Sequence, residues 1–198
     1  SPNHPNKFIV HSSTQLLIMK KQLVLCLLLS LTAFGLSAQI QTPAASPTAM
    51  VSQRVGLTKV TVEYSRPSVK GRKIFGDLVP FDKVWRTGAN KITTIKFDND
   101  VMINGKKLAA GKYGFFIALY PDSCVLIFNK NTEGWGSYFY RSDLDVLHVA
   151  TVQQKNQPQL VERLTYNFYN QTEKSVEIAL EWERWKIPFT VEVDAMNN

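Results

Sequence analysis

The feature that most constrains this chain is an alternation of apolar and polar residues with a period of two. Residues 59–65 place Val60, Val62 and Tyr64 on one face, with polar side chains at the positions between them. This alternation is typical of a β-strand that has one face in a hydrophobic core. The pattern returns at residues 91–97, 101–104, 143–152, 159–169, 175–185 and 186–193. No segment after residue 38 shows a convincing helical stripe, so we expect an all-β fold.

Two further runs, residues 112–120 and 124–129, are almost continuously apolar, which is typical of central strands covered on both faces. Asn104-Gly105 indicates a hairpin turn because both residue types tolerate a positive φ, and Gly111 marks another turn. Many short strands joined by turns predict a single antiparallel β-sandwich, jelly-roll-like, of about eight or nine strands.

The start of the chain predicts export. Met19 is followed by Lys20 and Lys21, then by an apolar stretch, and small residues stand at Ser37 and Ala38. This order predicts a signal peptide over residues 19–38, because the 16 residues from 23 to 38 are fewer than the ~20 that span a bilayer. We expect residues 1–18 to be an upstream non-native or read-through segment, 39–50 a flexible leader and 51–198 the sandwich domain. The protein would then be periplasmic or secreted, with no transmembrane segment after cleavage.

Charge and cysteine content exclude several classes of function. Three of the 23 Lys and Arg residues and none of the 16 Asp and Glu precede residue 39, so residues 39–198 carry a net charge of only +4. An exported chain this weakly basic is a poor candidate for nucleic-acid binding. Cys124 is the only cysteine after residue 38, which rules out an internal disulfide there. Since no metal-ligand spacing or cofactor motif occurs, we predict neither a metal nor a cofactor.

Residues 66–90 form a 25-residue segment without a sustained period. Loops longer than ~12–15 residues are uncommon in compact domains and are often functional. Together with Lys91, the segment holds seven Lys or Arg and two Asp, so the positive charge of the domain is concentrated there. Its apolar residues can anchor it to the core; they are Ile74, Phe75, Leu78, Val79, Phe81, Val84 and Trp85.

This segment also carries a family resemblance. The runs YSRPSVKGR at 64–72, IFG at 74–76, LVP at 78–80 and VWRTGAN at 84–90 resemble the domain of unknown function 2911 family, and ING at 103–105, AGKY at 110–113, IFNK at 127–130 and LEWE at 180–183 fit it as well. The chain departs from the pattern at Phe81-Asp82, Ala109 and Cys124. The resemblance implies an exported Gram-negative protein with an all-β domain, and it carries over no activity or catalytic residue.

The cationic segment is the first candidate for a binding surface. Arg66, Arg72 and Arg86 can clamp a carboxylate, phosphate or sulfate, because a guanidinium offers paired donors. The alternative is that the arginines hold backbone carbonyls and Trp85 fills the core. The predicted ligand-binding residues are Arg66, Lys70, Arg72, Trp85, Arg86, Asn90 and Trp135. They favour a non-enzymatic envelope protein that binds an anionic metabolite or an envelope glycan.

Two other functions remain open. Glu181 and Glu183, two apart on a strand, would have Cα atoms ~6.6–7 Å apart, within the range over which two carboxyls serve a glycosidase. A glycan hydrolase would need both to line a concave pocket. The third reading is an assembly protein that docks an envelope partner through residues 66–90. Because the chain has no nucleophile elbow or triad motif, we predict no catalytic residue.

Three isolated features complete the candidates. His148 alternates with Leu144, Val146, Ala150 and Val152, which predicts that it points into or beside the core. Cys124 lies in an apolar strand, which predicts a buried thiol. Residues 134–140 are rich in aromatic side chains, which can form a glycan platform or close one end of the sandwich.

Overall fold

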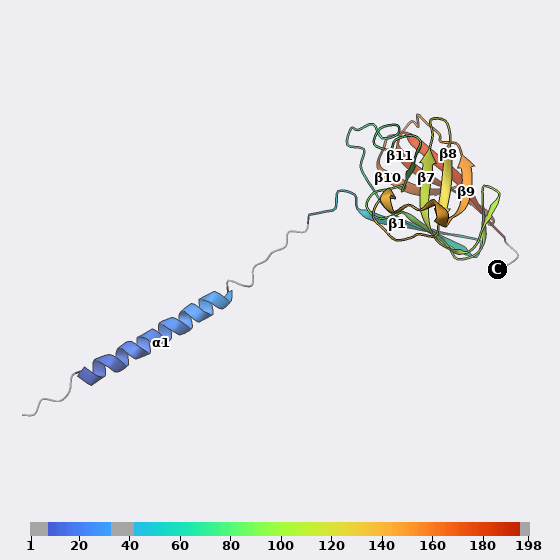
Figure 1. The fold of residues 1–198 in the computed structure, drawn as a ribbon. Helices are drawn as coiled ribbons and strands as arrows, with labels where there is room; N and C mark the ends of the chain where they lie inside the picture. The colour runs from blue at the N-terminus through green and yellow to red at the C-terminus, as the bar shows by residue number, and fades with distance from the viewer. Residues whose placement is uncertain (1–7, 33–41, 195–198) are drawn as a thin grey trace, which may run out of the picture. The chain divides into compact units, whose positions relative to one another are not determined.

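A computed structural model describes residues 8–32 and 42–194 (Figure 1). The first described part is one helix, α1 (Phe8–Thr32), which includes residues of the segment upstream of Met19 as well as of the predicted signal. No helix in the described parts of the chain is long and apolar enough to cross a membrane. The predicted cleavage site after Ala38 lies outside the described residues. The chain from Pro43 onward forms a separate compact unit.

This unit consists of two antiparallel sheets, which confirms the predicted all-β sandwich (Figure 1). The first sheet has the order β1-β2-β4-β7-β8-β9, and β3 also pairs with β7. Its strands are β1 (Thr48–Val55), β2 (Thr58–Ser65), β3 (Lys83–Trp85), β4 (Thr94–Phe97), β7 (Gly111–Leu119), β8 (Cys124–Asn129) and β9 (Asp145–Thr151). The second sheet has the order β10-β11-β12-β5-β6. Its strands are β10 (Val161–Tyr169), β11 (Ser175–Glu183), β12 (Trp185–Val193), β5 (Val101–Ile103) and β6 (Lys106–Leu108).

The described residues therefore form twelve strands instead of eight or nine. The three that the sequence pattern did not predict are β1, β3 and β6. Strand β1 lies at the edge of its sheet with most of its residues exposed or half-buried, and β3 and β6 are three residues long. Elements this short or this exposed carry too few alternating apolar positions to show a period.

The core lies between the two sheets and is rich in aromatic contacts. The inward faces of β2, β7 and β8 pack against those of β11 and β12. Phe115 of β7 meets Phe189 of β12 with ring centroids 5.5 Å apart, and Tyr64 of β2 meets Tyr166 of β10 edge-on at 4.7 Å. Since no disulfide links the described part of the chain, burial of these apolar side chains stabilises the domain.

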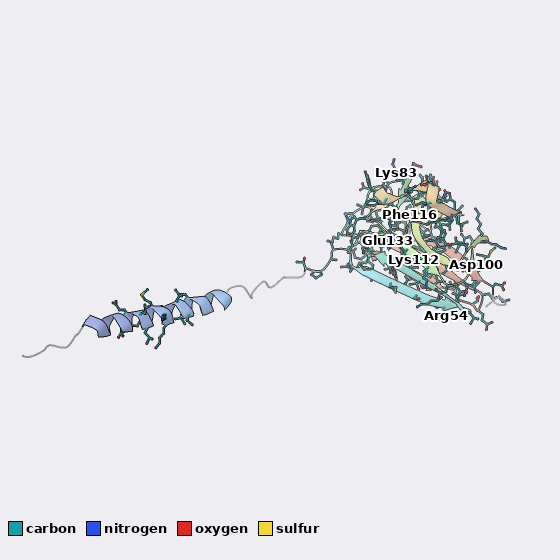
Figure 2. The ribbon with its side chains drawn as sticks, turned by 60° about the horizontal axis from the view of Figure 1, so that its bottom comes forward. Arg54, Lys83, Asp100, Lys112, Phe116 and Glu133 are labelled. Atoms are coloured by element: carbon teal, nitrogen blue, oxygen red, sulfur yellow. The ribbon has the colours of Figure 1, made fainter. Side chains whose placement is uncertain are left out.

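Strands β7 and β8 are also covered on their outer face, as their continuous apolar sequence predicts. A second cluster of buried residues there contains Ile92, Phe116, Ala118 and Ile127. Tyr140, from the connection between β8 and β9, packs on Phe116 with ring centroids 5.1 Å apart (Figure 2 labels Phe116). This connection therefore forms a partial third layer over the first sheet.

One interruption in the first sheet positions the candidate site. Strands β3 and β4 both pair with β7, β3 at residues 117–119 and β4 at 111–114. Between these two pairings, residues 86–93 leave β7 and form a loop. Phe115 of β7 holds the loop at both ends: its N–H donates to the Thr93 carbonyl at 2.8 Å, and its carbonyl accepts from the Thr87 hydroxyl at 3.0 Å. The loop passes so close to its neighbours that a Cβ at Gly88 would lie 2.8 Å from the Thr93 hydroxyl. A side chain at that position would require its neighbours to shift.

Candidate functional site

Residues 66–90 are anchored through part of their apolar set. Ile74, Phe75, Val79 and Trp85 are buried in the main core, as the sequence predicts, whereas Leu78 is exposed. The side chain of Phe75 stacks on Trp185 of β12, with ring centroids 4.3 Å apart. The segment is thus packed onto the sandwich through these apolar residues.

A cavity of about 410 Å³ opens beside this segment, a size within the range of small-molecule sites. We call it the arginine cavity. Its lining includes the three cations Arg72, Lys83 and Arg86, the indoles of Trp85 and Trp182, and Ser137. None of the described residues that line it is acidic. The cavity therefore concentrates positive charge without a protein carboxylate to balance it.

Two buried donors in the lining residues lack an acceptor. The Nε of Arg86 and the Nε1 of Trp182 are both buried, and neither has a hydrogen-bond partner among the described residues. Burial lowers the pKa of the Arg86 guanidinium, because desolvation disfavours its charged form. Most buried polar groups in proteins are hydrogen-bonded, so two unpartnered donors in the lining of one cavity call for an explanation.

Of the seven predicted binding residues, Arg72, Trp85 and Arg86 are brought together at this cavity. Arg72 already donates from Nε to the Val69 carbonyl at 3.0 Å and from Nη2 to the Ser68 carbonyl at 2.6 Å. Its guanidinium is therefore partly used by the backbone. Trp85 is buried and lies nearly parallel to Trp182, so it forms part of the core wall and is not an open stacking surface.

Two predicted residues lie elsewhere and have local structural contacts. Arg66 donates from Nε to the Leu164 carbonyl at 3.0 Å and from Nη2 to the Thr165 hydroxyl at 2.7 Å, which joins the end of β2 to β10. Lys70 occupies an exposed turn with φ 49°, and its backbone N–H donates to the Glu162 carboxylate at 3.0 Å. Neither side chain lines the arginine cavity.

The remaining two, Asn90 and Trp135, line a second hollow of about 360 Å³, which we call the Trp135 groove. The arginine cavity and the groove share a wall, because three chain segments contribute residues to both. Ser46, Ala89 and Ser137 line the cavity, whereas their near neighbours in the chain line the groove; these neighbours are Thr48, Asn90 and Trp135.

Asn90 holds this shared wall together. Its side-chain amide donates to the Ser46 carbonyl at 3.3 Å, and its own carbonyl accepts from the Gly136 N–H at 2.8 Å. Asn90 has φ 60°, a left-handed conformation that asparagine tolerates better than most residues. The predicted role of Asn90 as a direct ligand is untested, and its contacts here are with the protein.

A third hollow, of about 340 Å³, lies against β10 and β11 and is lined by both Glu181 and Glu183. We call it the glutamate hollow. The carboxylate of Glu181 accepts from the Asn167 amide at 2.6 Å and from the Tyr169 hydroxyl at 3.0 and 3.1 Å. The pKa of Tyr169 is raised, first by burial and then by the Glu181 carboxylate. The two glutamates thus share a concave site, as a hydrolase would require.

The prediction for His148 was wrong. Its side chain is 54% exposed and contacts the Asp145 carboxylate at 2.8 Å from Nε2. The period of two in β9 is present, but Val149 faces the core whereas Val146 and Ala150 share the exposed face with His148. The prediction for Cys124 is confirmed, since its thiol is fully buried and burial raises its pKa to about 12.

In the parts of the chain that the structure describes, no group of His, Cys, Asp or Glu side chains could hold a metal ion.

The sequence patterns did not identify Trp182 and Ser137 as lining residues of the arginine cavity. Trp182 alternates with Val176, Ile178 and Leu180, so the pattern indicated only a core residue. The one available signal was chemical, because a tryptophan on a buried face brings an N–H that needs an acceptor.

The fold and these hollows define a class: a β-sandwich domain with a cationic cavity, whose described lining has no acidic residue, beside a long connecting segment. Residues 46–191 match the family model described as protein of unknown function (DUF2911), and the chain belongs to this family, which confirms the resemblance seen in the sequence. No curated protein and no solved structure gives a significant match.

Proposed function

We propose that this protein is an exported envelope protein that binds an anionic small molecule in the arginine cavity. The observation that carries the proposal is the pair of buried donors without acceptors, Arg86 Nε and Trp182 Nε1, in the lining of one cavity. A buried donor left unsatisfied destabilises a protein by about 1–3 kcal/mol. An anion bound in the cavity would offer these donors the acceptors that the protein does not supply.

The lining favours an anion over a neutral ligand. Arg72, Lys83 and Arg86 supply three positive charges, and no acidic residue of the described lining competes for them. A guanidinium pairs with a carboxylate, phosphate or sulfate through two parallel hydrogen bonds, and such charge-assisted bonds are about twice as strong as neutral ones. The Ser137 hydroxyl adds a group that can donate to a further oxygen.

The exported setting rests on the sequence of residues 19–38, which has the order of a signal peptide. A binding role fits the sequence better than catalysis, since no catalytic motif accompanies the cavity. The ligand would then be a free metabolite or an acidic group of an envelope glycan.

The test is a thermal-shift screen of the purified protein against phosphate, sulfate, citrate and glucuronate. Ligand at a hundredfold excess over Kd stabilises the folded state by about 2.7 kcal/mol, and we expect at least one of these anions to raise Tm. Arg86→Gln should abolish the shift. Arg54→Gln is the matched control, because Arg54 is exposed on β1 (labelled in Figure 2) and, within the described chain, its guanidinium donates to the nearby Leu57 carbonyl.

Two results would contradict the proposal. The first is a shift that persists in Arg86→Gln. The second is the absence of a shift with any of the anions, which would leave docking of a protein partner through residues 66–90 as the alternative.

A second candidate function is hydrolysis of an envelope glycan by Glu181 and Glu183. It is favoured by one observation, that both carboxylates line the glutamate hollow. If it is correct, Glu181→Gln abolishes turnover of a glycan panel while the protein remains folded by circular dichroism. Unchanged turnover in this variant would exclude Glu181 from catalysis.

A further inference from the structure

We propose that the Trp135 groove is a second binding site, which takes one neutral saccharide unit stacked on the indole of Trp135. This goes beyond the anion site, because the two hollows differ in lining and charge although they share a wall. The inference stands on the exposure of Trp135, the way its backbone is held, and the chemistry of the groove floor.

The first observation is an exposed indole on a fixed backbone. Trp135 is 61% exposed, although tryptophan is the residue with most to gain from burial. Its flanking residues are held from both sides: the Gly136 N–H donates to the Asn90 carbonyl at 2.8 Å, and the Gly134 carbonyl accepts from the Ile92 N–H at 3.2 Å. The backbone that presents the ring is therefore ordered before any ligand arrives, which lowers the entropic cost of binding.

The second observation is that the groove floor offers both donors and acceptors. Glu63 and Lys112 form an ion pair at 3.2 Å across the exposed face of the first sheet, and Thr94 stands beside them. Glu133 and Lys91 line the rim (Figure 2 labels Lys112 and Glu133). A sugar hydroxyl is donor and acceptor at once, so a ring of hydroxyls can match a floor of mixed polarity.

The same lining argues against other occupants. An anion would face the carboxylates of Glu63 and Glu133, which the arginine cavity does not have. An apolar peptide would have to cover the charges of Lys91, Glu63 and Lys112 without replacing their hydration, which is unfavourable. A saccharide unit avoids both difficulties, because its hydroxyls face the floor while its C–H face covers the indole.

Exposure alone does not single out Trp135. Tyr138 is 93% exposed on the same connection and contacts Phe139 edge-on, with ring centroids 5.7 Å apart. Tyr138, however, lines neither the groove nor the arginine cavity. It therefore provides a matched control, because it is an aromatic side chain more exposed than Trp135 and three residues away that does not line the groove.

The test is isothermal titration of the purified protein with three neutral hexasaccharides: chitohexaose, cellohexaose and maltohexaose. We expect at least one to bind, and Trp135→Ala to weaken that binding by about tenfold or more. Tyr138→Ala and Arg54→Gln should leave the saccharide Kd unchanged. Because Trp135→Ala is expected to keep the thermal shift with anions, failure of this site and failure of the anion site are distinguishable.

Three outcomes would overturn the inference. One is that none of the three hexasaccharides binds the wild-type protein at millimolar concentration. Another is equal binding by Trp135→Ala and the wild-type protein. The last is an equal loss of binding in Tyr138→Ala, which would show that the effect does not depend on the groove.

Discussion

The indole of Trp182 lies nearly parallel to that of Trp85, with ring centroids 6.0 Å apart and planes inclined by 17°. Trp85 belongs to β3 of the first sheet and Trp182 to β11 of the second, so the pair joins the two sheets at the wall of the arginine cavity. Phe75 meets both rings edge-on, at 6.0 and 6.2 Å. The candidate anion site is therefore continuous with the core.

Trp182→Phe removes the Nε1 donor and keeps an aromatic ring. The void left by the smaller ring destabilises the variant, whereas loss of the unsatisfied donor stabilises it by about 1–3 kcal/mol, so we expect little net change in the unfolding free energy of the ligand-free protein. We also expect the Tm shift caused by the bound anion to decrease, because one of its two buried donors is gone. Trp185→Phe is the control, since Trp185 lines the glutamate hollow and not the cavity. An undiminished anion shift in Trp182→Phe would remove Trp182 from the site.

Arg66→Ala should affect stability and not binding. Arg66 donates to the Leu164 carbonyl and to the Thr165 hydroxyl, and hydrogen bonds from charged groups each contribute about 1.5–3 kcal/mol. We expect urea unfolding to report a loss of about 3 kcal/mol, the low end of the sum because Arg66 is half-buried, while the anion shift stays the same. A variant of wild-type stability that no longer binds the anion would show that Arg66 contacts the ligand.

Asp145→Ala should loosen the connection between β8 and β9. The Asp145 side chain is only 8% exposed, and its carboxylate accepts from the Tyr140 hydroxyl at 2.6 Å and the Asn129 amide at 2.6 Å, besides its contact with His148. Removal would strand these donors, and we expect a loss of about 2–3 kcal/mol with faster amide exchange over residues 130–144.

Asp143→Ala is the control for this prediction. Asp143 pairs with Arg141 at 2.6 Å on the surface, where such pairs contribute little. Equal amide exchange in the two variants would show that Asp145 does not hold the connection.

The buried thiol of Cys124 should make the folded protein less stable at alkaline pH. Burial raises the pKa of its thiol from 9.0 to about 12, so above pH 9 the unfolded chain loses a proton that the folded chain retains. The thiol's contribution to stability is therefore complete below pH 9 and declines as the pH rises toward 12. At about pH 10.5 the loss amounts to about 2 kcal/mol.

The comparison that isolates this effect is with Cys124→Ala, because tyrosines of raised pKa, such as Tyr140 and Tyr169, titrate in both proteins. Urea unfolding from pH 8 to about pH 10.5 should show a steeper decline for the wild-type protein. Parallel curves would mean that the Cys124 thiol ionises without opposing folding.

The sequence predicts most of this fold because burial imposes a visible period on its strands. Residues 59–65 lie in β2, which buries one face, and residues 112–120 lie largely in β7, which buries both faces, as the sequence patterns predicted. The period does not say which face of a strand turns inward. His148 was therefore misplaced: the alternation in β9 is real, but Val149, on the opposite face, is the residue that the core buries.

The lining of the candidate cavity was predictable only in part. Concentrated positive charge pointed to residues 66–90, and Arg72 and Arg86 do line a common cavity. No local pattern reveals that Arg66 is bound to β10, which follows it by about a hundred residues in the chain. The contribution of Trp182 was hidden for the same reason, because it depends on the packing of the second sheet against β3.

The loop between β3 and β4 places Thr87 directly after Arg86. Thr87 is β-branched and fully buried, yet it adopts φ 55°, a conformation that its Cβ disfavours. Its hydroxyl donates to Phe115 and its carbonyl accepts from the Tyr166 hydroxyl at 3.2 Å, so the surrounding core maintains this strained backbone. Folding, and not the ligand, therefore sets the direction of Arg86. If the proposed anion binds there, the fixed backbone at Thr87 predicts an association rate set by diffusion and electrostatic attraction.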